Sequence, residues 1–395
     1  MLKVIPVASP IAREEDVERV KENFRKLYPE LEMGKTVREE RKAEEESKGY
    51  DVLGLIVTGG TEHIMGALKG SARSFSAVYH GSLNSMPAVL EASSAFGFRS
   101  FNIDDKEGIE SYAKAVEIAE EMRSERLLLI GDPSPWLVYS GYSQSPESII
   151  KGVEKEEIAE LIQLARSYEV NDEEVSEVRS RAESFGPSIE DFRTSLKIEK
   201  AIRNMLEEKK TKFFTVKCFD ILEPLKGTAC LALSRLNDEG FVAACEGDVA
   251  ASLTMLLLSR ASGLPSFMGN VAKVKGRSML LAHCTSPTKI LSDFRYMHHF
   301  ESGLGVGIAG RLKEGETVTV ARIDTKKKVL RAGSGKVMSE PFREDLCRTQ
   351  VKVELKDPSA IVEKPIGNHY ALTPGDHLKL LESFAYVEGY SFERI

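Results

Sequence analysis

The stretch YDVLGLIVTGG, residues 50–60, joins a run of apolar residues to a pair of glycines. A short apolar run that ends in glycines is typical of a buried strand in a parallel sheet. Two segments precede it: the apolar run LKVIPVA (2–8), and REEDVERVKENFRKLY (13–28), whose apolar residues recur at helical spacing. The order strand, helix, strand predicts a βαβ unit and therefore a sheet covered by helices.

The same alternation continues toward the C-terminus and predicts an α/β domain over residues 1–126. The charged segment 36–49 has no apolar face, so we expect a solvated helix there, with a linker as the alternative. Helical patterns dominate from about 145 to 210, and strands then return, which predicts a central α/β domain over 127–270. After residue 271, glycine turns separate β-rich stretches and predict a mostly antiparallel barrel or sandwich over 271–395.

Composition narrows the classes of partner. The net charge is -7 and the pI is near 5.7, with no long run of one sign, so we expect neither nucleic acid nor a membrane as a partner. No segment approaches the roughly 20 apolar residues that span a bilayer. The five cysteines form no CxxC pair, which favours reduced thiols and a cytoplasmic location.

Two carboxylates follow the apolar strand in GFVAACEGDVAASLTMLLLSRASG (240–263) and precede a strongly apolar helix. Ligands of parallel sheets bind at the carboxyl ends of strands, so Glu246 and Asp248 are candidate catalytic residues. The alternative for Asp248 is a helix N-cap, and the dipole of the same helix would also favour Glu246 at this place.

Two histidines stand at comparable positions. His283 ends the apolar run in LLAHCTSP (280–287), and His369 lies between glycine and proline turns in KPIGNHYALTPGDH (364–377). Taken singly, each has an alternative, a core histidine bonded to a carbonyl for His283 and a structural turn for His369. Together with Glu246 they form a set of two imidazoles and one carboxylate that suits a divalent metal.

Other motifs carry less weight. GVGIAG (305–310) matches a dinucleotide-binding fingerprint, but a strand and turn follow it instead of a helix, so it is discounted. In MHHF (297–300), adjacent side chains of an extended segment point to opposite faces, which favours a surface or interface role. His80 and Asn84 follow a strand and are candidates for binding hydroxyl groups, with a helix cap at Asn84 or Ser85 as the alternative.

In this order, FVAACEGDVAASLTMLLLSRASGLPSFMGNV, LLAHCTSP and IGNHYALTPGDH resemble the L-fucose isomerase and L-arabinose isomerase superfamily. The resemblance implies two Rossmann-like domains followed by a β-barrel-like domain. It also implies a homo-oligomer, a hexamer or trimer, with active sites shared between subunits. The chain, which is shorter than the classical enzymes, most resembles a compact, fucose-isomerase-like and archaeal branch.

Residue by residue, Glu246 matches the family glutamate that ligates manganese and acts as an acid/base group. His369 matches the C-terminal histidine ligand, and His283 resembles the additional histidine ligand of the arabinose enzymes. The chain departs from the family at FMGNV, where neither Gly269 nor Asn270 is acidic although the second acidic ligand is expected there. Asn270 can offer a carbonyl oxygen to a metal, but it cannot abstract a proton.

The resemblance therefore implies a metal-dependent aldose–ketose isomerase that acts on a sugar through an enediol, with Mn²⁺ preferred and Mg²⁺ or Co²⁺ as alternatives. Asp248, Asp293 or Glu301 is expected to replace the missing acid. Contacts to the sugar are expected from Asn270, Asn368, Tyr370, His80, Asn84 and Glu301.

Two other classes remain open at this stage. One is another metal-dependent sugar enzyme, an epimerase or a lyase, for which Arg295, Arg311 and Arg343 could bind an anionic group. The other is a sugar-binding protein that kept the fold without catalysis, because fold alone does not fix function.

Overall fold

The computed structural model describes residues 1–182, 184 and 186–395, and these form two compact units. Unit 1 comprises Met1–Glu120 and Glu382–Tyr390, and unit 2 comprises Glu121–Leu381 and Ser391–Ile395. The sequence pattern places residues 382–390 in the C-terminal domain, but they belong to unit 1, and the boundary expected at residue 270 falls inside unit 2. Within the described residues, the helices are too short or too polar to cross a membrane.

Unit 1 is built on a parallel sheet in the order β1-β2-β3-β4, as the βαβ pattern predicts. Its strands are β1 (Leu2–Val7), β2 (Asp51–Ile56), β3 (Ser74–Tyr79) and β4 (Arg99–Asn102). Parallel bridges from Met33 and Val37 to β1 add an extended segment beside that strand. After β1 the chain first adds this segment on one side of the strand and then β2 on the other side. The strand order therefore switches between β1 and β2, and parallel sheets bind ligands at such a switch point.

The helices of unit 1 bury apolar faces against this sheet. They are α1 (Glu14–Leu27), α2 (Glu40–Ser47), α3 (Glu62–Ser71), α4 (Ser85–Phe96), most of α5 (Lys106–Ser124) and the end of α13 (Leu378–Glu388). In α2 only Ala43 and Ser47 are buried, so the solvated helix expected over 36–49 is present over Glu40–Ser47, whereas Val37 is buried and bridges to β1. The Tyr386 hydroxyl donates a hydrogen bond of 2.5 Å to the Phe75 carbonyl, which ties α13 to β3.

Unit 2 contains a second parallel sheet, in the order β6-β5-β7-β8. Its strands are β5 (Arg126–Ile130), β6 (Gly152–Glu156), β7 (Phe213–Val216) and β8 (Val242–Cys245). Its helices are α6 (Ile158–Ser167), α7 (Asp172–Arg179), α8 (Ile189–Lys209), α9 (Leu222–Leu225), α10 (Cys230–Asp238) and α11 (Val249–Ser262). The expectation of helix from residue 145 is wrong at β6, because this charged segment pairs with β5 as an edge strand, a place where charges are common.

A closed antiparallel barrel follows in unit 2 and confirms the β-rich C-terminal prediction. Its strands run β13-β16-β9-β10-β15-β14, and β14 pairs again with β13; β17 (Ser391–Arg394) adds to β14 in parallel. The barrel strands are β9 (Phe267–Lys275), β10 (Ser278–His283), β13 (Thr317–Asp324), β14 (Val329–Met338), β15 (Thr349–Glu354) and β16 (His369–Pro374). β11 (Asp293–Met297) and β12 (Gly307–Arg311) form a separate hairpin, and α12 (Ala360–Glu363) is a single turn.

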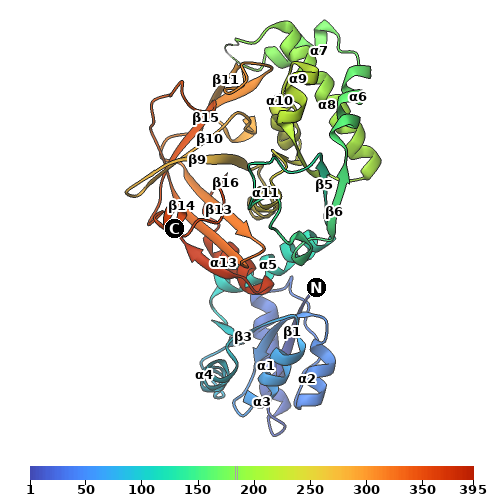
Figure 1. Cartoon of the computed structure of the whole chain (residues 1–395). Coiled ribbons are helices and arrows are strands. Elements are labelled where there is room, and N and C mark those ends of the chain that lie inside the picture. The colour runs from blue at the N-terminus through green and yellow to red at the C-terminus, as the bar shows by residue number, and fades with distance from the viewer. Residues whose placement is uncertain (183, 185) are drawn as a thin grey trace. The chain divides into compact units, whose positions relative to one another are not determined.

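Helix α11 connects the two halves of unit 2 (Figure 1). It packs against β8 on one side and against β13 and β16 of the barrel on the other. All residues from Val249 to Leu258 are buried, because both sides of this apolar helix are covered. As a result, the residues that precede α11 lie next to the first residue of β16.

Candidate active site

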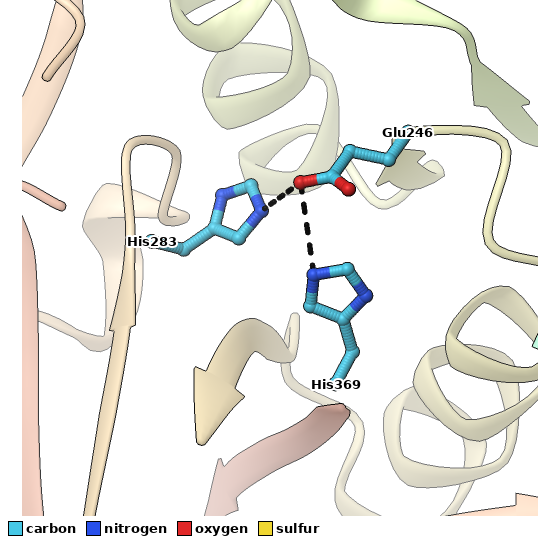
Figure 2. A group of neighbouring side chains, drawn as sticks. All are labelled: Glu246, His283 and His369. Carbon is cyan, nitrogen blue, oxygen red and sulfur yellow. Dashed lines mark ion pairs between the residues drawn. The ribbon is translucent and has the colours of Figure 1, made fainter. Parts of the chain in front are cut away.

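Three buried side chains converge where β8, β10 and β16 meet. Glu246 directly follows β8, His283 is the last residue of β10, and His369 is the first residue of β16. Figure 2 shows that both imidazoles point at one oxygen of Glu246: the Nε2 atoms of His283 and His369 each lie 3.7 Å from Oε1. The three potential ligand atoms lie within 4.8 Å of one another. The structure thus brings together the set that the sequence singled out.

The backbone around Glu246 is unusual. Glu246 has a φ of 63°, in the left-handed region that side chains other than glycine rarely adopt, and Gly247 follows with a φ of 70°. A Cβ on Gly247 would lie 2.7 Å from Pro133 Cα, so only glycine fits at this contact. The Ser134 amide also donates to the Glu246 carbonyl, at 2.9 Å. Strain of this kind in a buried turn is typical of functional sites.

Electrostatics keep Glu246 ionised. Burial raises the pKa of this carboxyl, but the imidazoles of His283 and His369, each 3.7 Å from Oε1, and the hydrogen bond that Trp136 donates to Oε2 outweigh burial. The pKa of Glu246 therefore falls to about 2. A carboxylate in this state can ligate a metal or accept a proton.

Asp248 lies behind His369 instead of facing the convergence point. It is the N-cap of α11, and its Oδ1 accepts a hydrogen bond of 2.8 Å from the Ala251 amide. Its Oδ2 lies 2.8 Å from His369 Nδ1, and both side chains are fully buried. Burial raises the pKa of Asp248, but Arg322 and the bond with His369 lower it to about 2.

This contact explains the orientation of His369. An ionised Asp248 can only accept, so the Nδ1 of His369 carries the proton and its Nε2 presents a lone pair toward Glu246. The geometry makes Asp248 a cap and an orienting partner, while its predicted catalytic role stays a prediction.

The loop before β16 is shaped by buried Arg322. Its Nε donates to the Ile366 carbonyl at 2.7 Å, and its Nη1 donates to the His369 carbonyl. Gly367 has a φ of 128°, and a Cβ there would fall on the Arg322 guanidinium. Gly367 is therefore needed for Arg322 to reach the carbonyl groups of this loop.

The imidazoles fit a metal ion. Among the described residues, neither the Nε2 of His283 nor that of His369 has a hydrogen-bond partner, although both are buried. Two ligands that each lie about 2.1 Å from one ion are at most about 4.2 Å apart, so the 3.7 Å separations suit shared coordination. The Thr285 amide lies 3.4 Å from His283 Nδ1, which is too long to fix a tautomer.

The other predicted residues have different positions. Asn270 is the register partner of His369 across β9 and β16, and Asn368 Nδ2 donates to its Oδ1 at 3.0 Å. Glu301 is exposed; burial of part of the group and the nearby Glu246 raise the pKa of its carboxyl. Asp293 lines a different cavity, together with Arg311.

Tyr370 points away from the point where the three side chains converge, and its predicted contact with the sugar stays a prediction. Its side chain is fully buried in the barrel core, and its hydroxyl lies 3.2 Å from Arg331 Nη1. Tyr370 follows His369 on β16, and successive residues of a strand point to opposite faces, so only one of the two can face the site.

His80 and Asn84 lie in unit 1. His80 is buried; its Nε2 lies 3.0 Å from the Val57 carbonyl and its Nδ1 lies 2.9 Å from the Ser82 hydroxyl. Asn84 is the N-cap of α4 by position, in the left-handed region, and it lines a cavity after β1, β2 and β3. Their predicted contacts with the sugar stay predictions.

Sequence reasoning missed an aromatic wall beside Glu246. Trp136 Nε1 donates a hydrogen bond of 2.7 Å to Glu246 Oε2. The indole packs edge-on against Phe219, with ring centroids 4.8 Å apart, and Phe219 packs in the same way against His299, at 5.6 Å. His299 is buried, which corrects the surface role expected for it. Burial and the nearby His283 lower its pKa to about 4, so the ring is neutral at pH 7.

Comparison with known proteins points to sugar isomerases. Residues 145–262 match the family model of the L-arabinose isomerase central domain, a segment that contains Glu246 and Asp248. The chain is also similar to sulfoquinovose isomerases. That of Alkalicoccus urumqiensis is 24% identical over 75% of this chain and 71% of its own length. That of Clostridium sp. (strain MSTE9) is 24% identical over 68% of this chain and 64% of its own length.

These matches support an arabinose/fucose isomerase-like superfamily. A third relative, the sulfoquinovose isomerase of Priestia megaterium, is 23% identical over 44% of this chain and 42% of its own length. The chain thus spans between 42% and 71% of the length of these three relatives. The fucose branch and the archaeal origin stay predictions.

Proposed function

We propose that this protein is a metal-dependent aldose–ketose isomerase of sugars. The observation that carries the proposal is the convergence of two buried imidazole Nε2 atoms without hydrogen-bond partners on Oε1 of an ionised Glu246. The matches to arabinose and sulfoquinovose isomerases support the class of reaction. They do not favour an epimerase, a lyase or a sugar-binding protein.

Glu246, His283 and His369 would hold the metal. One carboxylate oxygen and two imidazole nitrogens suit Mn²⁺, with Mg²⁺ or Co²⁺ as alternatives, and three protein ligands leave positions for substrate oxygens. When bound, the ion would polarise the carbonyl and hydroxyl oxygens at C1 and C2 of the open-chain sugar.

Isomerisation moves a proton from C2 to C1 through an enediol. Glu246 is ionised and its carboxylate is available to accept the C2 proton. Glu301 is the candidate for the second acid, because partial burial and the nearby Glu246 raise the pKa of its carboxyl while the residue stays exposed. Asp248 and Asp293 fit that role less well, since one is committed to His369 and Ala251 and the other lines a different cavity.

The substrate is proposed to be a hexose or pentose whose open-chain form carries a hydroxyl at C2. Sulfoquinovose, L-arabinose and L-fucose are the first sugars to test, because the first two appear in the names of the matches and the third in the resemblance.

The test combines metal content with turnover. Protein purified without added metal is analysed for bound metal, loaded with Mn²⁺ and assayed for ketose formation from each sugar. We expect about one bound ion per chain and turnover of one of these sugars. Glu246→Gln keeps the shape of the side chain but removes its charge, so turnover is expected to be abolished while the thermal melt stays cooperative. Full turnover by this variant would remove Glu246 from the mechanism.

A further inference from the structure

Trp136 lies on the loop that follows β5, and it is the only tryptophan of the chain. Its indole N–H is bonded to Oε2 of Glu246 at 2.7 Å, while Oε1 of the same carboxylate faces both imidazoles. The two oxygens of Glu246 therefore have different partners. The indole N–H is the group that fixes the rotation of the carboxylate, and with it the direction of Oε1.

The ring of Trp136 has a second distinctive property. Its exposed fraction is 50%, although one edge packs against Phe219 and its N–H is committed to a buried carboxylate. An aromatic residue that served only the core would be covered, and a surface aromatic would not bond to a buried ligand residue. A rigid, partly open aromatic surface next to a few convergent polar groups is what small-molecule sites commonly provide.

The loop that carries Trp136 is held at several points. The Tyr139 hydroxyl donates to Asp324 Oδ2 at 2.6 Å, and the Ser145 amide donates to Thr325 Oγ1 at 2.8 Å. The Ser134 amide bonds to the Glu246 carbonyl, so the backbone of the same loop also holds the turn. Trp136 is thus preorganised in this position, as residues that orient a reacting group need to be.

We propose that Trp136 is a positioning residue that orients the Glu246 carboxylate and offers its exposed ring to the apolar face of the sugar. The second half rests on the proposed isomerase function, whereas the first half concerns Glu246 alone. The two roles use different groups of Trp136: the N–H orients the carboxylate, and the ring contacts the sugar.

Two substitutions separate the role of the N–H from the role of the ring. Trp136→Phe keeps a ring and removes the donor, so we expect kcat to fall by about tenfold to a hundredfold, the range for a hydrogen bond to a charged group, with a smaller change in KM. Mn²⁺ affinity is expected to fall too. Trp136→Gln keeps an N–H donor without the ring, so kcat is expected to recover relative to Trp136→Phe while KM rises. Val138→Ala, in the same loop and 73% exposed, is the control that should change neither.

Fluorescence provides a test that does not require turnover. Since Trp136 is the sole tryptophan, its emission reports on this one site. Mn²⁺ added alone to metal-free protein is expected to quench it, because the metal would bind to a carboxylate that the indole contacts. Unchanged emission at a Mn²⁺ concentration that saturates the protein would overturn the contact.

The two proposals fail in different ways. Absence of turnover by the wild type with every sugar would contradict the isomerase, while Mn²⁺ quenching would still support the orienting role of Trp136. Wild-type turnover together with the same kcat and KM for Trp136→Phe, Trp136→Gln and Val138→Ala would overturn the role of Trp136 and leave the isomerase intact.

Discussion

The two parallel sheets of this chain have the same architecture but different chemistry at their carboxyl ends. In unit 2, the segments after β5, β7 and β8 supply Trp136, Phe219 and Glu246, and Trp136 contacts both of the others. In unit 1, the segments after β1, β2 and β3 line a cavity of about 410 Å³ with small residues such as Ser9 and Gly59. Parallel sheets bind ligands at the carboxyl ends of their strands, so both edges are candidate binding sites.

The difference lies in the side chains that the barrel adds to the edge of the unit 2 sheet. In unit 2, barrel strands β10 and β16 deliver His283 and His369 to the edge, and α11 fixes Asp248 behind His369. The cavity of unit 1 is lined by a single ionisable side chain, Glu62, among the described residues. The barrel thus adds two candidate ligands to the edge of the unit 2 sheet, whereas the described residues at the edge of the unit 1 sheet line a cavity without histidines.

The largest expected effect is on the ligand from the barrel. His369→Ala should weaken Mn²⁺ binding by a factor of roughly a thousand or more, since one of three ligands is removed and Asp248 is left buried without its partner. Metal analysis after dialysis measures this loss. His377→Ala is the matched control, because His377 lies in the same segment and contacts the Pro374 carbonyl instead. Equal metal content in both variants would show that the turn GNHY (367–370) has a structural role and that His369 is not a ligand.

The next effect separates a ligand from its orienting partner. Asp248→Asn keeps a good N-cap for α11, but the amide is uncharged and no longer selects one tautomer of His369. Loss of such a partner typically costs about 10- to 100-fold in metal affinity, and we expect a change of this size in a Mn²⁺ competition titration. Asp238→Asn, which alters bonds to Thr288 and Lys289 elsewhere in unit 2, should not weaken binding. If both variants bind alike, Asp248 is only a cap.

Local patterns made much of the fold predictable. The alternation of strands and helical periodicity gave the parallel sheets, and glycine turns between short strands gave the barrel. Strand β6 was missed because its charged residues suit a helix equally well, and pairing with β5 decided the outcome. Strong periodicity allows secondary structure to be predicted from sequence, whereas the pairing of a strand at the edge of a sheet cannot be predicted in this way.

The site was predictable only in part, for the same physical reason. Glu246, His283 and His369 are chemically distinctive at strand ends, so they could be singled out. Trp136 lies in a loop with no pattern, and its contact with Glu246 spans 110 positions. Alternation along β16 already places Tyr370 on the face opposite to His369, which is a pattern that the sequence alone contains.

A smaller effect is expected from the turn that presents His369. Gly367→Ala introduces a side chain at a φ of 128°, directly against Arg322, so unit 2 should lose about 1–3 kcal/mol of stability and bind Mn²⁺ a few-fold more weakly. Thermal unfolding and metal titration measure the two effects. Gly276→Ala, at a φ of 57° with open space around it, isolates the backbone cost. Similar melting of both variants would show that the fit against Arg322 does not matter.

The smallest effect on the metal is expected from the other sheet edge, and it tests whether the two edges are independent. A Cβ on Gly59 would lie 2.7 Å from Asn84 Cβ and 2.9 Å from the Asn84 carbonyl oxygen, so Gly59→Ala should destabilise unit 1 by about 1–3 kcal/mol. Gly81→Ala, with nothing within 4 Å, is the neutral control. Mn²⁺ affinity should stay at the wild-type value in both, because every candidate ligand belongs to unit 2. Weaker Mn²⁺ binding by Gly59→Ala than by Gly81→Ala would show that the carboxyl ends of the unit 1 strands influence Mn²⁺ affinity, and the two sheet edges would then not be independent.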